Sequence, residues 1–203
     1  MKRIVYSWCA VIVLAAVTAS ARADAIDDYV HERMRELRLP GVALAVVRGG
    51  EIVTVRCFGS ADLEHAVPVS EDIVFEIGSL TKQFTAIALM MLVEEGKVAL
   101  DDSVTKHLPQ LPPTWAKITV RHLLTHSSGI QEYLSVPGLP EQAHAASRDE
   151  RTRLLAQKLK LEFAPGVTWS YSNSGYLLLG NIIGGDGRFG SVVWNDDRPD
   201  VIG

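Results

Sequence analysis

The hydrophobic positions in the first part of the chain repeat with two different periods, which predict a helix followed by a β-hairpin. In residues 24–39 the apolar side chains recur every three or four positions, and Pro40 follows, so we expect an amphipathic helix. Residues 42–58 hold two apolar runs, the second alternating with polar residues, on either side of Gly49 and Gly50. Because glycine readily adopts positive φ, this pair predicts a tight turn between two antiparallel strands.

Two later segments carry helical signals of other kinds. Strong helix formers occupy residues 80–95, and the glycine that follows is placed to end a helix. Ser147 and Glu150 have the spacing of a capping box, in which each side chain bonds the other residue's backbone, and they predict a helix through Lys160.

The first 23 residues have the pattern of an export signal. Lys2 and Arg3 give a positive start, residues 4–17 are almost wholly apolar, and residues 21–23 (Ala-Arg-Ala) have the small-x-small form that signal peptidase accepts. The apolar run is shorter than the ~20 residues that a membrane-spanning helix needs. We therefore expect cleavage after this segment, export to the periplasm, and no stable membrane anchor afterwards.

Composition narrows the classes of protein that remain. The 203 residues carry a formal charge of -4, and 47% of them are hydrophobic, as in ordinary globular proteins. Cleavage after residue 23 removes three basic residues and no acid, which lowers the charge to -7. The chain has no basic surplus, so no nucleic-acid partner is expected. Its two cysteines are too few for a disulfide scaffold, and no Cys/His cluster has the spacing of a structural zinc site.

The first candidate for catalysis is Ser79, three residues before Lys82, at the start of the predicted helix 80–95. Helical residues three apart share a face, so Lys82 can serve as the base that a serine nucleophile needs. A helix N-terminus also favours the negative charge that develops during attack. The same Ser-x-x-Lys spacing recurs at Ser103 and Lys106, but the neighbouring Asp, Ser and Pro residues predict a loop there. The context therefore favours Ser79.

The second candidate is the pair Tyr171 and Asn173, within residues 165–180. A Pro-Gly turn opens this segment, Trp169 is interpreted as an apolar anchor, and serines precede an apolar helix that is expected to begin near Tyr176. Two residues apart in an extended stretch, Tyr171 and Asn173 would project the same way. From this pair alone, a core tyrosine beside a capping asparagine is the favoured interpretation.

Residues 75–86, 122–130 and 165–180 together resemble three blocks of the serine β-lactamase-related family, in the same order. That family holds class C β-lactamases, penicillin-binding carboxypeptidases and esterases. The resemblance covers residues 24–183 and implies an α/β (α+β) fold of the β-lactamase/transpeptidase type. Such a fold has an antiparallel sheet with flanking helices beside a helical domain, and we expect this chain to hold its N-terminal portion.

The resemblance implies a serine hydrolase that forms an acyl-enzyme on β-lactam, D-alanyl peptide or ester carbonyls, with small-molecule or peptide substrates and no cofactor. Ser79 would be the nucleophile, and either Lys82 or Tyr171 would be the base that deprotonates it. Asn173 would orient the substrate amide and help to hold Lys82. The backbone N–H of Ser79 would supply half of an oxyanion hole.

Other kinds of site have weaker support. The chain contains no Gly-x-Ser-x-Gly, the motif that carries the nucleophile of α/β-hydrolases. His122 and His126 are four residues apart, but a zincin has glutamate after the first histidine and this chain has Leu123. We expect both histidines to support the structure or the site, and no metal to bind.

The resemblance ends before the family's third motif, a Lys or His followed by a small residue and Gly. No Lys-Thr-Gly, Lys-Ser-Gly or His-x-Gly occurs in this chain, and residues 184–203 form a Gly-rich tail that we interpret as aberrant for the family. Two alternatives to an active hydrolase follow: a catalytically inactive, truncated remnant that binds ligands weakly at most, or a fragment completed by a partner chain. The sequence leaves the oligomeric state open.

Overall fold

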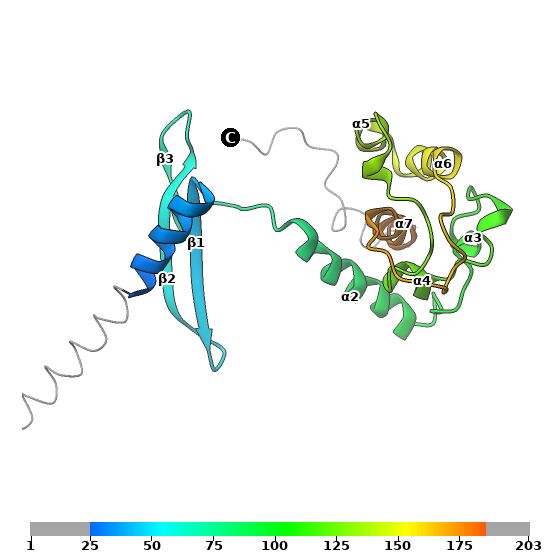
Figure 1. Ribbon diagram of the computed structural model, residues 1–203. Coiled ribbons are helices and arrows are strands. Elements are labelled where there is room, and N and C mark those ends of the chain that lie inside the picture. The colour runs from blue at the N-terminus through cyan, green and yellow to red at the C-terminus, as the bar shows by residue number, and fades with distance from the viewer. Residues whose placement is uncertain (1–24, 186–203) are drawn as a thin grey trace, which may run out of the picture. The chain divides into compact units, whose positions relative to one another are not determined.

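The structure, a computed structural model, describes residues 25–185 as parts of two compact units, one up to Glu76 and one from Ile77 onward (Figure 1). The predicted export signal and nearly all of the predicted Gly-rich tail lie outside the described residues. Within the described part of the chain, no helix is both long enough and apolar enough to cross a membrane.

The sheet of the first unit is built on the predicted hairpin. Strand β1 (Gly41–Arg48) pairs antiparallel with β2 (Glu51–Asp62), and the two turn residues, Gly49 and Gly50, have φ of 61° and 87°, which confirms the expected turn. The end of β2 also pairs with a third strand, β3 (Val67–Pro68). The sequence identified only the hairpin, because two residues are too few to show a strand's period.

The predicted N-terminal helix is confirmed and spans residues 25–37. It lies along the hairpin as the dark blue helix of Figure 1. Its His31 ring and the buried Phe58 ring of β2 lie nearly perpendicular, at a centroid distance of 5.3 Å. Beside this contact the Arg56 guanidinium lies 3.4 Å from the Asp27 carboxylate. The ring contact and the ion pair both connect the helix to β2.

Helix α7 (Asn173–Gly184) is the centre of the second unit. It contacts α2 (Thr81–Glu94), α4 (Val120–Leu124) and α6 (Arg148–Lys158), which surround it in Figure 1. A helix that is apolar on all sides is stable only when it is buried, and every residue from Leu177 to Ile183 is buried. The polar exception, Asn181, donates a 2.7 Å hydrogen bond to Thr152 of α6.

Short elements enclose this central helix and complete the apolar core. Helix α5 (Leu139–Ala145) contacts α6, and α6 begins where the capping box of Ser147 and Glu150 predicts. Two 3₁₀ turns, η2 (Pro113–Trp115) and η3 (Tyr133–Ser135), bring large side chains into the core. The largest fully buried side chains of the unit include Leu89, Leu92, Ile118, Leu123, Leu139, Leu155 and Ile183.

The loop predicted around the second Ser-x-x-Lys pattern is wrong, because residues Val104–His107 form a short helix, α3. Ser103 caps this helix by accepting from the Thr105 N–H. The Asp102 carboxylate accepts from the Lys106 ammonium at 2.7 Å, and also from the Ala99 N–H and the His107 ring. These donors, Lys106 first, lower the pKa of Asp102 below its ordinary value. Lys106 therefore bonds a carboxylate and not the preceding serine.

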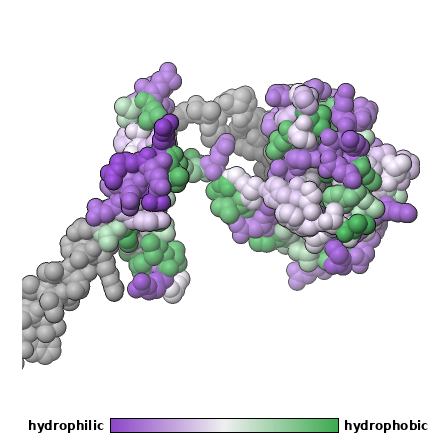
Figure 2. All heavy atoms as spheres, in the orientation of Figure 1, coloured by the Kyte–Doolittle hydropathy of each residue, from purple (hydrophilic) through white to green (hydrophobic). Residues whose placement is uncertain are grey.

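Helix α2 has two apolar faces of different exposure. One face, with Ala88, Leu89 and Leu92, is buried in the core of the second unit. The other carries Phe84 and Ile87, which are both more than half exposed. Figure 2 shows apolar surface along this segment. The buried face fixes the helix that carries Lys82 and begins two residues after Ser79.

Candidate active site

Ser79 lies in a single 3₁₀ turn, η1 (Gly78–Leu80), that leads directly into α2. Its side chain is exposed, and no side chain caps the N-terminus of α2. The partial positive charge of this helix end therefore remains available to a negative charge that develops near Ser79. The sequence prediction of a serine at a helix N-terminus is confirmed, with the difference that the first turn is 3₁₀.

Lys82 follows one turn later and its ammonium reaches two site residues. Its Nζ lies 2.7 Å from Asn173 Oδ1 and 3.4 Å from Ser79 Oγ. The same nitrogen lies 4.9 Å from the centre of the Tyr171 ring and 5.4 Å from that of Tyr176. The two rings thus provide a cation–π environment, which favours a positive charge at this position.

Tyr171 lies in the segment before α7, and its phenol oxygen is 2.7 Å from Ser79 Oγ. The two residues are 92 positions apart in the sequence, and the structure brings them together. The Lys82 side chain, and after it the Ser79 hydroxyl, lowers the pKa of the Tyr171 phenol below its ordinary value. A phenol with a lowered pKa, in hydrogen-bond contact with a serine hydroxyl, has the position that a general base requires.

Asn173 is the first residue of α7, whereas the sequence placed it before the helix. Ser172 is the N-cap instead and accepts from the Gly175 N–H at 3.0 Å. Each side of the Asn173 amide has a partner: Oδ1 accepts from Lys82, and Nδ2 donates to Glu132 Oε1 at 3.3 Å. The backbone N–H of Asn173 donates to the other carboxylate oxygen of Glu132 at 2.6 Å.

His126 supports the tyrosine from its other side. Its ring stacks on Tyr171 at 4.8 Å and lies 5.0 Å from Tyr176. Its Nδ1 accepts a 3.0 Å hydrogen bond from the Ser172 N–H, which requires Nδ1 to be unprotonated. Burial, followed by the charge of Lys82, lowers the pKa of His126 and so favours this neutral form.

The other two candidate residues have structural positions. His122 completes a capping box at the start of α4, where its Nδ1 accepts from the Thr119 N–H. Trp169 was interpreted as an apolar anchor, but its side chain is 65% exposed and only its ring edge approaches His126, at 6.1 Å. The anchor interpretation is wrong, because the Trp169 side chain lies mostly at the surface and not in the core.

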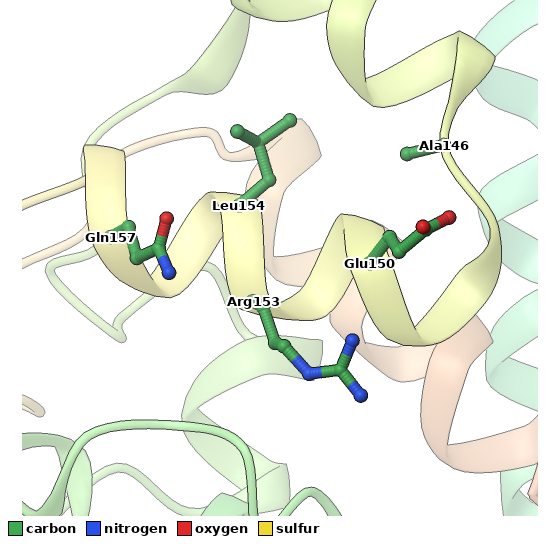
Figure 3. Close-up of a pocket in the computed structure, with 5 residues that line it drawn as sticks. All are labelled: Ala146, Glu150, Arg153, Leu154 and Gln157. Carbon is green, nitrogen blue, oxygen red and sulfur yellow. The ribbon is translucent and has the colours of Figure 1, made fainter.

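Glu132 is the site residue that sequence reasoning missed. It lies two positions after the block 122–130, yet a single carboxylate after a motif gives no signal of a partner 41 positions away. No group of three or more His, Cys, Asp or Glu side chains among residues 25–185 is arranged to hold a metal ion. A pocket of about 280 Å³ lies beside α6 and is lined by Ala146, Glu150, Arg153, Leu154 and Gln157 (Figure 3). It contains none of the four candidate catalytic and substrate-binding residues.

Comparison with known proteins finds a family model and relatives that match this chain. The family model described as Beta-lactamase matches residues 26–186. Esterase EstB of Burkholderia gladioli is 39% identical over 174 residues, and penicillin-binding protein 4* of Bacillus subtilis (strain 168) is 36% identical over 145 residues. These matches cover 78% and 70% of this chain, and 43% and 32% of the two relatives. The chain therefore spans less than half the length of either relative.

The fold is similar to that of solved structures from the same group. The octameric penicillin-binding protein homologue from Pyrococcus abyssi aligns with a TM-score of 0.68 and 34% identity. The alignment covers 81% of this chain and 39% of that protein. The expected β-lactamase/transpeptidase-like fold is thereby confirmed for the aligned portion.

Proposed function

Because this chain belongs to the Beta-lactamase family, we propose that it performs acyl transfer through a covalent ester on Ser79, which Tyr171 and Lys82 activate. One observation carries the proposal: the Ser79 hydroxyl lies 2.7 Å from the Tyr171 phenol oxygen and 3.4 Å from the Lys82 ammonium. A serine hydroxyl is a weak nucleophile until a positioned base removes its proton, and this contact supplies such a base.

The proposed first step forms one bond and breaks another. Ser79 Oγ attacks the substrate carbonyl carbon while its proton passes to the Tyr171 phenolate. The tetrahedral intermediate collapses when the C–N or C–O bond of the substrate breaks, and the leaving group takes the proton from Tyr171. Water then attacks the serine ester by the same route, which releases the acid and restores the Ser79 hydroxyl.

Two features support Tyr171, in preference to Lys82, as the immediate base. The phenol oxygen is closer to Ser79 Oγ than the Lys82 nitrogen is. Lys82 also donates its shorter hydrogen bond to Asn173 and lies over two aromatic rings, an environment that suits a retained positive charge. In this proposal Lys82 remains a cation, and its charge favours the phenolate form of Tyr171.

Asn173 and the start of α2 would contribute to binding. The Asn173 amide is placed next to the reacting hydroxyl through Lys82, where it can orient a substrate amide. The Ser79 N–H would donate to the developing oxyanion, a contribution that is often the largest in such reactions. The names of the relatives include an esterase and a penicillin-binding protein. We therefore propose esters, β-lactams and D-alanyl peptides as the substrate class.

The proposal is tested by covalent labelling of the full chain with a fluorescent penicillin and a fluorophosphonate. Labelling is expected for the wild type and should be lost in Ser79→Ala. Ser103→Ala is the matched control, because Ser103 has the same Ser-x-x-Lys spacing but bonds Thr105 and caps α3. Labelling that persists in Ser79→Ala, or a wild type that neither probe labels, contradicts the proposal and favours the non-catalytic alternative.

We further propose that the protein is exported to the periplasm with removal of residues 1–23. The support is the sequence pattern of a positive start, an apolar run and a small-x-small site. N-terminal sequencing of the protein from a periplasmic extract is expected to begin at Asp24, and recovery of the intact N-terminus there would contradict cleavage.

A further inference from the structure

Glu132 connects the segment after α4 to the start of α7. Its position is fixed on the preceding side by the bridge between Ile130 and Leu161 and by the Gln131 N–H, which donates to the Lys160 carbonyl at 3.0 Å. From this position its carboxylate accepts from the Asn173 N–H at 2.6 Å and from Asn173 Nδ2 at 3.3 Å.

These contacts determine which way the Asn173 amide points. An ionised carboxylate can only accept hydrogen bonds, so the amide must turn its NH₂ group toward Glu132. The Oδ1 atom then faces the opposite side, where the Lys82 ammonium donates to it at 2.7 Å. With the amide reversed, the NH₂ group would face an ammonium and an oxygen would face a carboxylate, and both contacts would be repulsive.

We propose that Glu132 is a positioning residue for this site, which holds the Asn173 amide in the one orientation that keeps the Lys82 ammonium beside Ser79 and Tyr171. Glu132 has no hydrogen bond to Ser79 among those described, and it acts through Asn173 and Lys82. The inference rests on the proposed function, because only a reaction at Ser79 gives the orientation of Asn173 a role. The orientation itself can be tested without any reaction.

If Glu132 acts by positioning Asn173, its replacement should shift the pKa of Tyr171 in the opposite direction from the shift expected if it acts only through its charge. The negative charge of Glu132 raises the pKa of the Tyr171 phenol, whereas the Lys82 side chain, the largest influence on this group, lowers it. Removal of the carboxylate charge alone would therefore lower the pKa of Tyr171 further. Loss of the Lys82 position would instead raise that pKa toward the ordinary tyrosine value of about 10.

The variant Glu132→Gln separates the two effects. Its side chain keeps the shape of Glu132 but presents only one acceptor, so it cannot accept from the Asn173 N–H and from the Asn173 NH₂ group with separate oxygens as Glu132 does. The Asn173 amide is then expected to turn, and the Lys82 ammonium to lose its acceptor. Ultraviolet difference titration of the phenol, with Tyr171→Phe as the reference that identifies the Tyr171 signal, is expected to show a pKa that is higher than in the wild type.

Two further variants complete the test. Glu132→Asp keeps the charge but shortens the reach to Asn173, so a smaller upward shift is expected, whereas an effect of charge alone would leave the titration unchanged. Glu141→Gln is the matched control, because it makes the same chemical change at an exposed position on α5 and should leave the Tyr171 titration as in the wild type. A Tyr171 pKa that falls in Glu132→Gln, or that stays unchanged in both Glu132 variants, overturns the inference.

Labelling by the fluorophosphonate keeps this inference separate from the proposed function. Labelling of Glu132→Gln is expected to be about tenfold slower than that of the wild type, the size typical of coupled hydrogen-bonded residues. A wild type that is not labelled contradicts the function of Ser79, while the titration still decides the role of Glu132. A wild type that is labelled, with an unchanged titration in the Glu132 variants, contradicts only the positioning role.

Discussion

At the scale of single residues, removal of the Tyr171 hydroxyl should change the structure little and the proposed chemistry strongly. Tyr171→Phe keeps the ring that stacks on His126 and removes the oxygen that lies 2.7 Å from Ser79. We expect labelling of Ser79 to slow by about 10²- to 10⁴-fold, the usual contribution of general base catalysis, with little change in melting temperature. Labelling rates and thermal melts measure the two effects side by side.

Tyr176→Phe is the control for this prediction. It removes a hydroxyl from the other ring that lies against His126, where the oxygen donates to the Leu124 carbonyl at 3.1 Å and, within the described part of the chain, makes no hydrogen bond to Ser79. Its labelling rate should remain close to that of the wild type. Equal slowing in the two variants would show that the Tyr171 oxygen has no special role.

The lowered pKa of His126 predicts how the stability of the protein depends on pH. Burial, and then the charge of Lys82, lowers its pKa in the folded state, so the unfolded chain binds the proton more readily. The contribution of neutral His126 to the free energy of unfolding is therefore fully present above the ordinary histidine pKa of about 6.5. It is lost as the pH falls through the lowered pKa of the folded state. Protonation also removes the acceptor of the Ser172 N–H. Urea unfolding between pH 7 and pH 5 is expected to show a loss of stability.

The variant His126→Asn tests this linkage. Asparagine tolerates the left-handed backbone of this position, where φ is 57°, and it does not titrate in this range. The variant should be less stable than the wild type at pH 7, because it lacks the stacked ring, but its stability should change less between pH 7 and pH 5. If the stability of the wild type and of the variant falls by the same amount between pH 7 and pH 5, His126 is not the source of the pH dependence.

At the scale of elements, Gly129 fixes the segment that carries Glu132. Its φ is 78°, and a Cβ atom there would collide with the Phe163 carbonyl oxygen. Its own carbonyl accepts from the Glu162 N–H at 2.8 Å. Gly129→Ala is expected to destabilise the protein by more than the ~1–2 kcal/mol that a left-handed backbone costs a residue with a side chain, since the collision adds to it. Urea unfolding measures the difference.

Gly138→Ala is the matched control for this strain. Gly138 has a similar φ of 72°, but a Cβ atom there would meet only the Gln142 side chain, at an ordinary contact distance of 3.5 Å. It should therefore show the backbone cost alone. If Gly129→Ala is no more destabilising than Gly138→Ala, close packing against Phe163 has no part in fixing the loop.

The elements predicted correctly are those whose signals lie within a few residues. The Gly49–Gly50 turn and the capping box of Ser147 and Glu150 act over two to three positions, and the structure has both. The helix α3 was missed because Asp and Ser suit a loop as well as the start of a helix: here Ser103 caps α3, and the Asp102 side chain accepts from donors on both sides of it in the sequence. Secondary-structure propensities alone do not reveal a carboxylate that accepts several hydrogen bonds.

At the scale of the whole molecule, the site depends on contacts between distant segments. Ser79 and Lys82 could be paired from helix periodicity, but their contact with Tyr171 spans 92 positions and was expected only from the family resemblance. Glu132 was not expected at all, because its approach to Asn173 depends on how residues 129–131 pair with residues 160–163. That pairing has no counterpart in any local pattern of the sequence.

The division of the chain into two units predicts where a labelled protein can be cut. Residues 69–77, which lead to η1, form no regular helix or strand, and the Val74 side chain is 89% exposed. Exposed irregular segments are preferred sites of proteolysis, so a glutamate-specific protease is expected to cut first at Glu71 or Glu76. Ser79, Tyr171 and the other site residues all follow these positions, so mass spectrometry should find the fluorophosphonate on the C-terminal fragment.

The control for this cut is the double variant with Glu71→Gln and Glu76→Gln, which should resist the first cleavage while it is labelled at the wild-type rate. Both side chains are exposed and precede the second unit, so their replacement should not alter the contacts of Ser79. First cuts within the helices of residues 77–185 would contradict the division of the chain, because those backbones are held by helical hydrogen bonds and a shared core. A label on the N-terminal fragment would contradict the location of the nucleophile.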